Sequence, residues 1–307
     1  MNNWARSFLP LLGMTLLLIL QPSRGIAMND DIAVQVNAAF AAARQENYEL
    51  ISQLAEQGAQ IIPYLKPYLQ DDNEMLRLQA VALLTASADP AVVPLLTLAL
   101  RDASQELRAR AALALYERHD PLQLAERSEV GEALRASIDQ GNDAAAALLL
   151  LGYFPGKSSL KALQALNKRA GDAQTELATW APVVPVRLAA AVSLSRLGDQ
   201  AGRLTLLQTS AESTPAEREF LLSVLREIDS PEVLHALAAG TLGDVSPIGG
   251  GVPSGVQPQR RLCDLAVVSF VKRLSLKVNF VVDDQHPFTS AEIDAVRQAI
   301  AGSLPQG

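Results

Sequence analysis

The chain has 307 residues, 49% of them apolar, and a formal net charge of −7. An acidic chain without a basic stripe is a poor candidate for nucleic-acid binding, because phosphate neutralisation supplies most of that affinity. Aromatic residues make up only 5%, which favours close-packed helices over a β-sandwich or barrel. Cys263 is the single cysteine and excludes an internal disulfide. We interpret it as a small buried apolar residue, with a covalent dimer as the alternative.

Residues 1–27 have the features of a secretory signal peptide. A short apolar run, residues 8–20, follows one positive side chain, and the small residues Gly25 and Ala27 suit signal peptidase, so the mature chain would begin near Met28. The run is shorter than the ~20 apolar residues that cross a bilayer comfortably. We therefore predict a periplasmic or secreted protein without stable membrane insertion after cleavage. The alternative is an uncleaved N-terminal membrane anchor.

Two N-terminal capping helices are predicted over residues 28–57. The first extends to about Gln45, and the second ends at Gly58, since glycine commonly stops a helix. The apolar face of the first is expected to contain Val34, Ala38 and Ala41. A third helix is predicted over residues 59–69, where two prolines bend it or confine it to short turns.

A repeated pattern organises residues 58–242. Residues 76–84 read Leu-Arg-x-x-Ala-x-x-x-Leu, and residues 107–115 repeat this pattern 31 positions later. The same frame returns at residues 186–194 and around Arg218, and a weaker copy starts at Leu262. A fixed period of this size predicts an array of helical repeats.

Aspartates and prolines mark the junctions of this array. Asp71 or Asp72 is expected to accept the unpaired amide groups at the start of the helix that holds residues 76–84. Asp89-Pro90 and Asp120-Pro121 each begin a helix with proline at the first position, where its missing N–H costs nothing. Each unit is therefore predicted to contain two antiparallel helices joined by a short turn.

This alternation resembles HEAT-type repeats, including the HEAT-like group found with the phycobilin lyases. The resemblance is carried by residues 89–96 with 107–112, and by residues 186–191 with 196–199. It implies an all-α fold, a HEAT-like, armadillo-type α-solenoid of stacked antiparallel helix hairpins in a right-handed superhelix. The combination with a signal peptide indicates an exported bacterial protein.

The resemblance also implies a ladder between neighbouring units, formed by an arginine on the second helix and an aspartate in the turn within the repeat. The residues with this implied role are Arg77, Arg108, Arg187 and Arg218, with Asp72 and Asp102 as acceptors. The third unit, at residues 181–185, offers no aspartate, and the fourth has Ser213-Thr214 instead.

Three later segments depart from the period. Residues 120–181 are out of phase and are interpreted as about one and a half further units with an insertion, in which Trp180 is either a surface anchor or a packed residue. Residues 243–258 are rich in glycine and proline, and long loops in compact arrays are functional or disordered. This loop is either a solvated linker or a projection that presents Val252 and Val256 to a partner.

Residues 259–307 are predicted to form a terminal repeat and a capping helix that covers the open end of the array. Thr289 followed by Glu292 is a capping box, which indicates a helix start. The apolar face of that helix is expected to contain Ile293, Val296 and Ile300.

A search for catalytic, cofactor or metal sites gives no candidate. Gly156-Lys157-Ser158 lacks the earlier glycine of a phosphate loop, because Leu151 holds that place. His119, His235 and His286 each lack a second ligand three or four places away, which argues against zinc.

These observations favour a non-catalytic periplasmic scaffold that binds a protein or peptide partner in a repetitive groove. The alternative is a periplasmic enzyme or a lyase-type protein built on the same helices. The signal peptide weighs against a bilin lyase, because bilin attachment is cytoplasmic. Clustered titratable groups with displaced pKa values in the groove would favour catalysis, and apolar and amide side chains would favour binding.

Overall fold

The computed structural model describes residues 30–87, 89–177, 181–248, 260–283 and 287–304. The predicted signal peptide, Trp180, His286 and residues 249–258 of the predicted loop lie outside this part. Within it, the chain forms fifteen α-helices, four short 3-10 helices and two strands of two residues each. The predicted all-α class is therefore confirmed.

The elements and their bounds are as follows, in chain order. The α-helices are α1 (Asp30–Ala43), α2 (Glu49–Leu54), α3 (Glu74–Thr85), α4 (Val93–Ala99), α5 (Gln105–Arg118), α6 (Pro121–Ala125), α7 (Ser128–Asp139), α8 (Ala145–Leu151), α9 (Lys157–Arg169), α10 (Val186–Arg196), α11 (Gln200–Glu212), α12 (Pro215–Ser223), α13 (Pro231–Thr241), α14 (Leu262–Leu274) and α15 (Ser290–Ser303). The 3-10 helices are η1 (Ala55–Tyr64), η2 (Tyr68–Gln70), η3 (Pro90–Val92) and η4 (Leu225–Glu227), and the strands are β1 (Gln174–Thr175) and β2 (Val184–Pro185).

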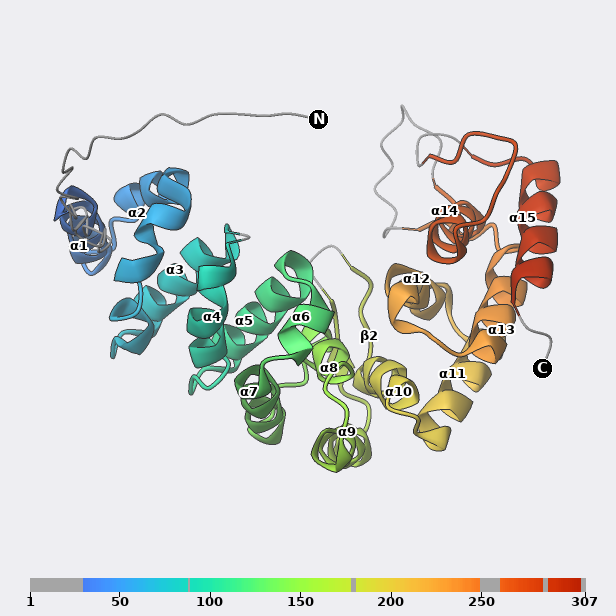
Figure 1. Cartoon of the computed structure of the whole chain (residues 1–307), viewed down its shortest axis with the longest axis horizontal. Helices are drawn as coiled ribbons and strands as arrows, with labels where there is room; N and C mark the ends of the chain where they lie inside the picture. Colours follow the sequence, from blue (N-terminus) through green and yellow to red (C-terminus); the bar gives the residue numbers. More distant parts are fainter. Residues whose placement is uncertain (1–29, 88, 178–180, 249–259, 284–286, 305–307) are drawn as a thin grey trace, which may run out of the picture.

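The helices form a curved row that starts at α1 and ends at α15 (Figure 1). Helices that are close in sequence pack against each other along the row; α10, for example, contacts α8, α9 and α11. In the C-terminal arm, α12 and α14 lie on the inner side of the curve, and α13 and α15 lie on the outer side (Figure 1). None of the described helices is both long enough and apolar enough to span a bilayer.

The repeated leucines and alanines form the core of this row. Leu84 of α3 and Leu115 of α5 occupy the same place in two sequence copies, and both are fully buried. The close approach of α10 and α11 depends on Gly202, where an added Cβ would lie 2.6 Å from the Cβ of Leu194. The sequence repeat therefore marks the apolar faces that neighbouring helices share.

The buried face of α1 differs from the predicted one. Val34 is 64% exposed, and Ala38 and Ala41 are exposed as well. The buried side chains include Val36 and Phe40, and the ring of Phe40 stacks on Tyr68 with centroids 3.7 Å apart. Burying the large aromatic ring removes more apolar surface from water than burying the two alanines, so Phe40 sets the rotation of the helix.

The segment predicted as a helix over residues 59–69 forms the 3-10 helices η1 and η2. Pro63 and Pro67 lack the N–H that a longer α-helix would use, so short turns replace it. Gly58 has φ 59°, a left-handed conformation that glycine adopts without strain, and it interrupts the helical geometry of η1. The apolar side chains of Ile62, Leu65 and Leu69 are buried.

Capping residues follow the prediction at two of three junctions. The side chains of Asp89 and Asp120 accept hydrogen bonds from the backbone two residues later, and proline follows each of them. Before α3, however, the cap is Asn73, whose Oδ1 accepts from the N–H of Met75 at 2.9 Å. Asp71 is one turn earlier and accepts from the N–H of Asn73 instead, which frees its second oxygen for an arginine.

The out-of-phase middle segment contains the helices α6 to α9. The insertion contributes β1 to the antiparallel pair β1–β2. Thr175 of β1 accepts a hydrogen bond from the N–H of Ala145 at 3.0 Å. The insertion therefore satisfies a backbone donor at the start of α8, which lacks a side-chain cap of its own.

The first residues of the predicted Gly/Pro-rich loop form backbone hydrogen bonds with the start of α14. Asp244 and Ser246 accept backbone hydrogen bonds from Cys263 and Leu262, both at 2.8 Å. Cys263 is 1% exposed, and burial raises the pKa of its thiol, so the predicted buried role is confirmed.

The terminal helix α15 begins with the predicted capping box of Thr289 and Glu292. Its expected apolar face is buried, and that face consists of Ile293, Val296 and Ile300. The helix packs against α13 and α14, so its apolar face covers the end of the row.

Candidate functional site

Arg77 donates hydrogen bonds to two turns of the chain, one at Asp71 and Asp72 and one at Asp102. Its Nε and Nη2 donate to the carboxylate of Asp102 at 2.8 and 3.1 Å, and its Nη1 donates to the carbonyls of Asp71 and Asp72 at 2.8 and 3.3 Å. Asp72 thus contributes a main-chain oxygen to this contact. Asp102 also accepts from the N–H of Ser104 at 2.8 Å, which orients the carboxylate toward the arginine.

Arg218 repeats this arrangement in the C-terminal arm. Its Nη1 donates to Asp244 at 2.7 Å, and the other oxygen of Asp244 accepts from the N–H of Ser246 at 2.9 Å. Burial opposes the charged form of Asp244, but the bonds from Ser246 and Arg218 outweigh it, so the pKa of this carboxyl lies below its usual range. Sequence reasoning missed Asp244 because it lies in the Gly/Pro-rich stretch. The signal was the motif Asp-x-Ser, shared by residues 102–104 and 244–246.

A third contact of this kind joins Arg44 to Asp71, which also accepts from the N–H of Asn73. We call these three contacts the rungs: Arg44–Asp71, Arg77–Asp102 and Arg218–Asp244. In each rung a carboxylate is held by a backbone amide two residues later and bonds an arginine 25 to 27 residues earlier.

Arg108 is buried but reaches main-chain oxygens instead of a carboxylate. It donates to the carbonyls of Asp102, Ala103 and Gln140 at 2.8, 2.7 and 3.1 Å. Asn142 stands in the turn before α8 as Asp102 does before α5, and its Oδ1 accepts from the backbone two residues later. Because an amide carries no charge, it offers the arginine no ion pair, and the carbonyl at the end of α7 takes that place.

Arg187 does not make the contacts that Arg77, Arg108 and Arg218 make with turns of the chain. It is exposed, and among the described residues it has no hydrogen-bond or ion-pair partner. Arg77, Arg108 and Arg218 are each the fourth residue of their helix, whereas Arg187 is the second residue of α10. The shift of two positions rotates the side chain by more than half a turn of helix, away from the preceding loop.

A second group of charged residues gathers around a buried carboxylate where α5, α10, η4 and α14 approach one another. Glu227 is 1% exposed and lies at the centre. We call this group the Glu227 cluster, and its members are Tyr116, Tyr153, Arg196, Arg226, Glu227, Asp229 and Arg273.

Both oxygens of Glu227 face positive groups. Oε1 accepts from the hydroxyl of Tyr116 at 3.0 Å and from Nε of Arg226 at 2.7 Å. Oε2 lies 3.7 Å from Nη1 of Arg196 and accepts no hydrogen bond from any described residue. Arg196 also pairs with Asp229 at 3.2 Å, so one arginine joins the buried carboxylate to an exposed one.

The two tyrosines of the cluster support the arginines. Arg196 lies 3.9 Å above the ring of Tyr153, and Arg226 lies 4.6 Å above the ring of Tyr116. Burial raises the pKa of both phenols above the ordinary tyrosine value, and Glu227 raises each of them further. Both phenols therefore remain protonated at neutral pH.

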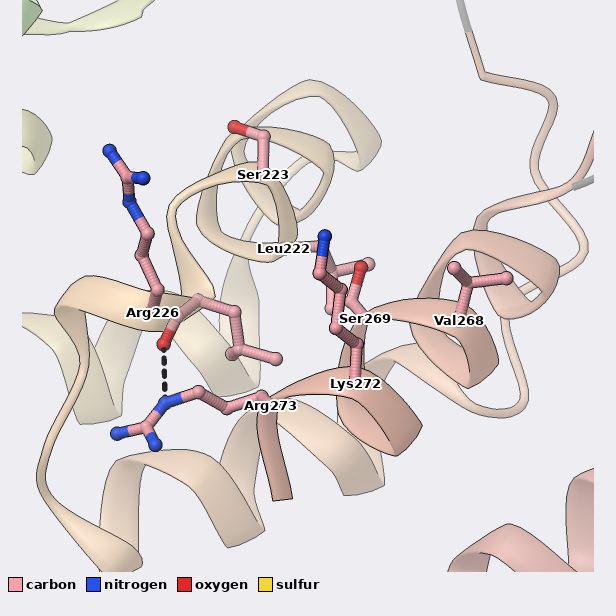
Figure 2. Close-up of a pocket in the computed structure, with 8 residues that line it drawn as sticks. Leu222, Ser223, Arg226, Val268, Ser269, Lys272 and Arg273 are labelled. Carbon is pink, nitrogen blue, oxygen red and sulfur yellow. Dashed lines mark hydrogen bonds between the residues drawn. The ribbon is translucent and has the colours of Figure 1, made fainter. Parts of the chain in front are cut away.

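A pocket of about 450 Å³ lies beside the cluster, between α12, η4 and α14 (Figure 2). Its lining combines an apolar floor, two hydroxyls and three cations. The lining residues are Leu222, Leu225 and Val268, Ser223 and Ser269, and Arg226, Lys272 and Arg273. Arg226 and Arg273 belong to both the pocket and the cluster. The dashed line in Figure 2 is the hydrogen bond from Nε of Arg273 to the carbonyl of Leu225, at 3.3 Å.

The described histidines and acids do not gather elsewhere. No three His, Cys, Asp or Glu side chains among the described residues are placed to hold a metal ion. Burial and the charge of Arg127 lower the pKa of His119, so this side chain is neutral at pH 7. The pocket and the Glu227 cluster are therefore the strongest candidate site in the described part of the chain.

No model of a known protein family matches the chain, and comparison with curated proteins and with solved structures also gives no match. The function of the protein is therefore inferred from the geometry of the fold and of this pocket.

Proposed function

We propose that the protein is a non-catalytic scaffold, a HEAT-like α-solenoid of helix hairpins in a right-handed superhelix, which binds a protein or peptide partner in the periplasm. Support comes from the curved row of helices and from the rungs, which join residues at nearly constant spacing. A curved array of this kind presents side chains at regular intervals along an extended surface.

The observation that carries this proposal is the pocket between α12 and α14. These helices lie on the inner side of the curve, where an extended partner would contact several units at once (Figure 1). The volume of about 450 Å³ is within the range of ligand-binding pockets. Glu227 holds Arg226, and the carbonyl of Leu225 holds Arg273, so two of the lining cations are fixed before a partner arrives.

The Glu227 cluster gathers titratable groups with displaced pKa values, the pattern expected of the alternative, an enzyme or lyase-type protein on the same helices, but the direction of the shifts supports binding. An efficient acid or base has a pKa near the working pH. Here the pKa values of Tyr116 and Tyr153 are displaced upward, away from neutrality, by burial and by Glu227. The displaced pKa values thus hold each phenol in one protonation state and do not prepare a proton transfer.

Export to the periplasm is proposed from residues 1–27, whose composition is that of a signal peptide. The intact mass of the protein purified from its native envelope tests this part. A mass that corresponds to a start near Met28 supports cleavage, and a mass that includes residues 1–27 supports the membrane anchor.

Site-specific photo-crosslinking tests the binding function. A photoreactive amino acid replaces Ser223, an exposed residue of the pocket, and in a matched variant it replaces Leu204, which is 54% exposed on α11. We expect one protein adduct at position 223 that mass spectrometry identifies, and no such adduct at position 204. Capture of a small molecule alone at position 223 would reverse the ranking and favour an enzyme.

A further inference from the structure

We infer that the pocket between α12 and α14 binds an acidic peptide segment in which carboxylates flank one apolar side chain. The inference rests on the proposed binding function and names the chemistry of the partner. It follows from the charge of the lining, the shape of its floor and the charge of the remaining chain.

The lining is positive within an acidic protein. Arg226, Lys272 and Arg273 contribute three cations, none of the eight described lining residues is acidic, and the whole chain has a net charge of −7. Glu227 pairs with Arg226, and Asp229 pairs with Arg273, so these two acids neutralise part of this charge. A local excess of positive charge remains, and it is complementary to carboxylates.

Two of the cations have capacity left for a ligand. Lys272 is exposed and has no ion-pair partner in the part of the chain that the structure describes. Arg226 uses Nε for Glu227, and its side chain is 54% exposed, which leaves its terminal nitrogens accessible to a carboxylate. Both side chains extend to the same side of the pocket (Figure 2).

The floor selects for an apolar group between the charges. Leu222 and Leu225 are buried, and Val268 is half-buried at the rim. A volume of about 450 Å³ accommodates one large apolar side chain together with its flanking backbone. Burying such a side chain removes apolar surface from water and favours binding, and the carboxylate contacts add to this effect.

An extended polyanion fits this site less well than a short peptide. Nucleic-acid affinity grows with the number of phosphates that the protein neutralises, and a chain of net charge −7 repels a long polyanion beyond the pocket. A peptide with two or three carboxylates engages the local cations and avoids that repulsion.

Selection from a random peptide library displayed on phage, with the mature chain as target, tests the inference. We expect enriched peptides in which aspartate or glutamate lies within two residues of leucine, isoleucine or phenylalanine. The enriched peptide, labelled with fluorescein, is then titrated with the protein and with its Lys272→Glu variant. The charge reversal should raise Kd at least about tenfold, since it replaces an attraction with a repulsion.

Lys161→Glu is the matched control, because Lys161 is exposed on α9, outside the pocket. It makes the same charge change and should alter Kd less than about twofold, because solvent screens distant charges. Circular dichroism and thermal unfolding check that both variants fold, and Lys272→Ala replaces Lys272→Glu if the reversal unfolds the protein. The alanine variant should also weaken binding, by a smaller factor.

Different outcomes would overturn the acidic ligand alone or peptide binding as a whole. Enriched peptides without acids, or peptides that bind Lys272→Glu as tightly as the unaltered protein, would overturn the acidic ligand and leave peptide binding intact. Enrichment of no peptide, together with binding to vesicles that contain phosphatidylglycerol, would overturn both and assign the pocket to lipid headgroups.

Discussion

Two kinds of arginine–carboxylate contact stabilise this molecule, and they differ in reach. A rung joins residues 25 to 27 positions apart, as Arg77 and Asp102 show, and it recurs along the row. The Glu227 cluster pairs Arg196 with Glu227 across 31 positions and adds a hydrogen bond to Glu227 from Tyr116, which lies 111 positions earlier. Each of the three rungs joins an arginine to a turn 25 to 27 residues later, whereas the cluster joins α5 to the C-terminal arm.

The two kinds of contact also differ in burial. The carboxylate of Asp102 is 10% exposed and accepts from an arginine and a backbone amide, so its charge is well satisfied near the surface. Glu227 is almost fully buried, and its charge depends on three side chains from different elements. The loss of a partner is therefore costlier in the cluster than in a rung.

Glu227→Ala tests this difference most severely. The substitution leaves Nε of Arg226 and the buried hydroxyl of Tyr116 without their acceptor and removes one of the two carboxylates beside Arg196, so we expect the free energy of unfolding to fall by ~3–5 kcal/mol. Urea unfolding followed by circular dichroism measures it. Glu106→Ala is the control, because the exposed pair of Glu106 with Arg110 is worth ~0.5 kcal/mol or less. Equal effects of the two substitutions would contradict the central role of Glu227.

Leu84→Ala and Leu115→Ala test whether the repeated leucines form the apolar core that lies between these charged contacts. Both leucines are fully buried, so each substitution should lower the free energy of unfolding by ~2–5 kcal/mol. Leu122→Ala, at a position 64% exposed, should cost less than ~0.5 kcal/mol in the same urea experiment. A cost near zero at both buried positions would mean that the repeat has been assigned to the wrong face.

Arg77→Ala and Arg187→Ala compare an arginine that forms a rung with the arginine at the same place of the sequence repeat that forms none. Loss of the bonds from Arg77 to Asp102 should cost ~1.5–3 kcal/mol, because hydrogen bonds between charged groups are the stronger ones. Arg187 is exposed, so its removal should change the free energy of unfolding by less than ~0.5 kcal/mol. Chemical denaturation of both variants decides, and a large effect at Arg187 would show that its copy is a rung after all.

The smallest expected effect concerns pH. Burial opposes the charge of Asp264, but Arg261 and the N–H of Phe288 outweigh it and lower the pKa of its carboxyl below the ordinary value of 3.8. A lowered folded-state pKa contributes stability above the unfolded value, and this contribution is lost as pH falls through the folded value. The Tm of the protein should therefore exceed that of Asp264→Asn at pH 7, and the gap should narrow as pH falls below 3.8. A constant gap would show that charge is not the cause.

Sequence patterns predicted what depends on local chemistry. Asp89 and Asp120 cap their helices because the side chain and its amide partner are two residues apart, and proline fixes the next position. The capping box of Thr289 and Glu292 is local in the same sense. The burial of Leu84 and Leu115 followed from a repeat that every unit shares.

The features that the sequence patterns did not predict depend on contacts between distant parts of the chain or on where a neighbouring element ends. The place of Arg187 follows from where α10 begins, and that start is set by the strand before it. The rotation of α1 follows from the stacking of Phe40 on Tyr68, across an intervening helix. No local signal joins Tyr116 to Glu227, so the Glu227 cluster emerged only from the structure.

The wide separation of Tyr116 and Glu227 has a consequence for the nascent chain. At ribosomal speed, on the order of ten seconds pass between the synthesis of Tyr116 and the synthesis of Glu227. During that interval the early rungs can close, whereas the segment from α5 onward still lacks its acceptor. We therefore expect translation that stops before residue 227 to release a partly folded fragment, which proteases cleave near α5 and spare in the completed protein.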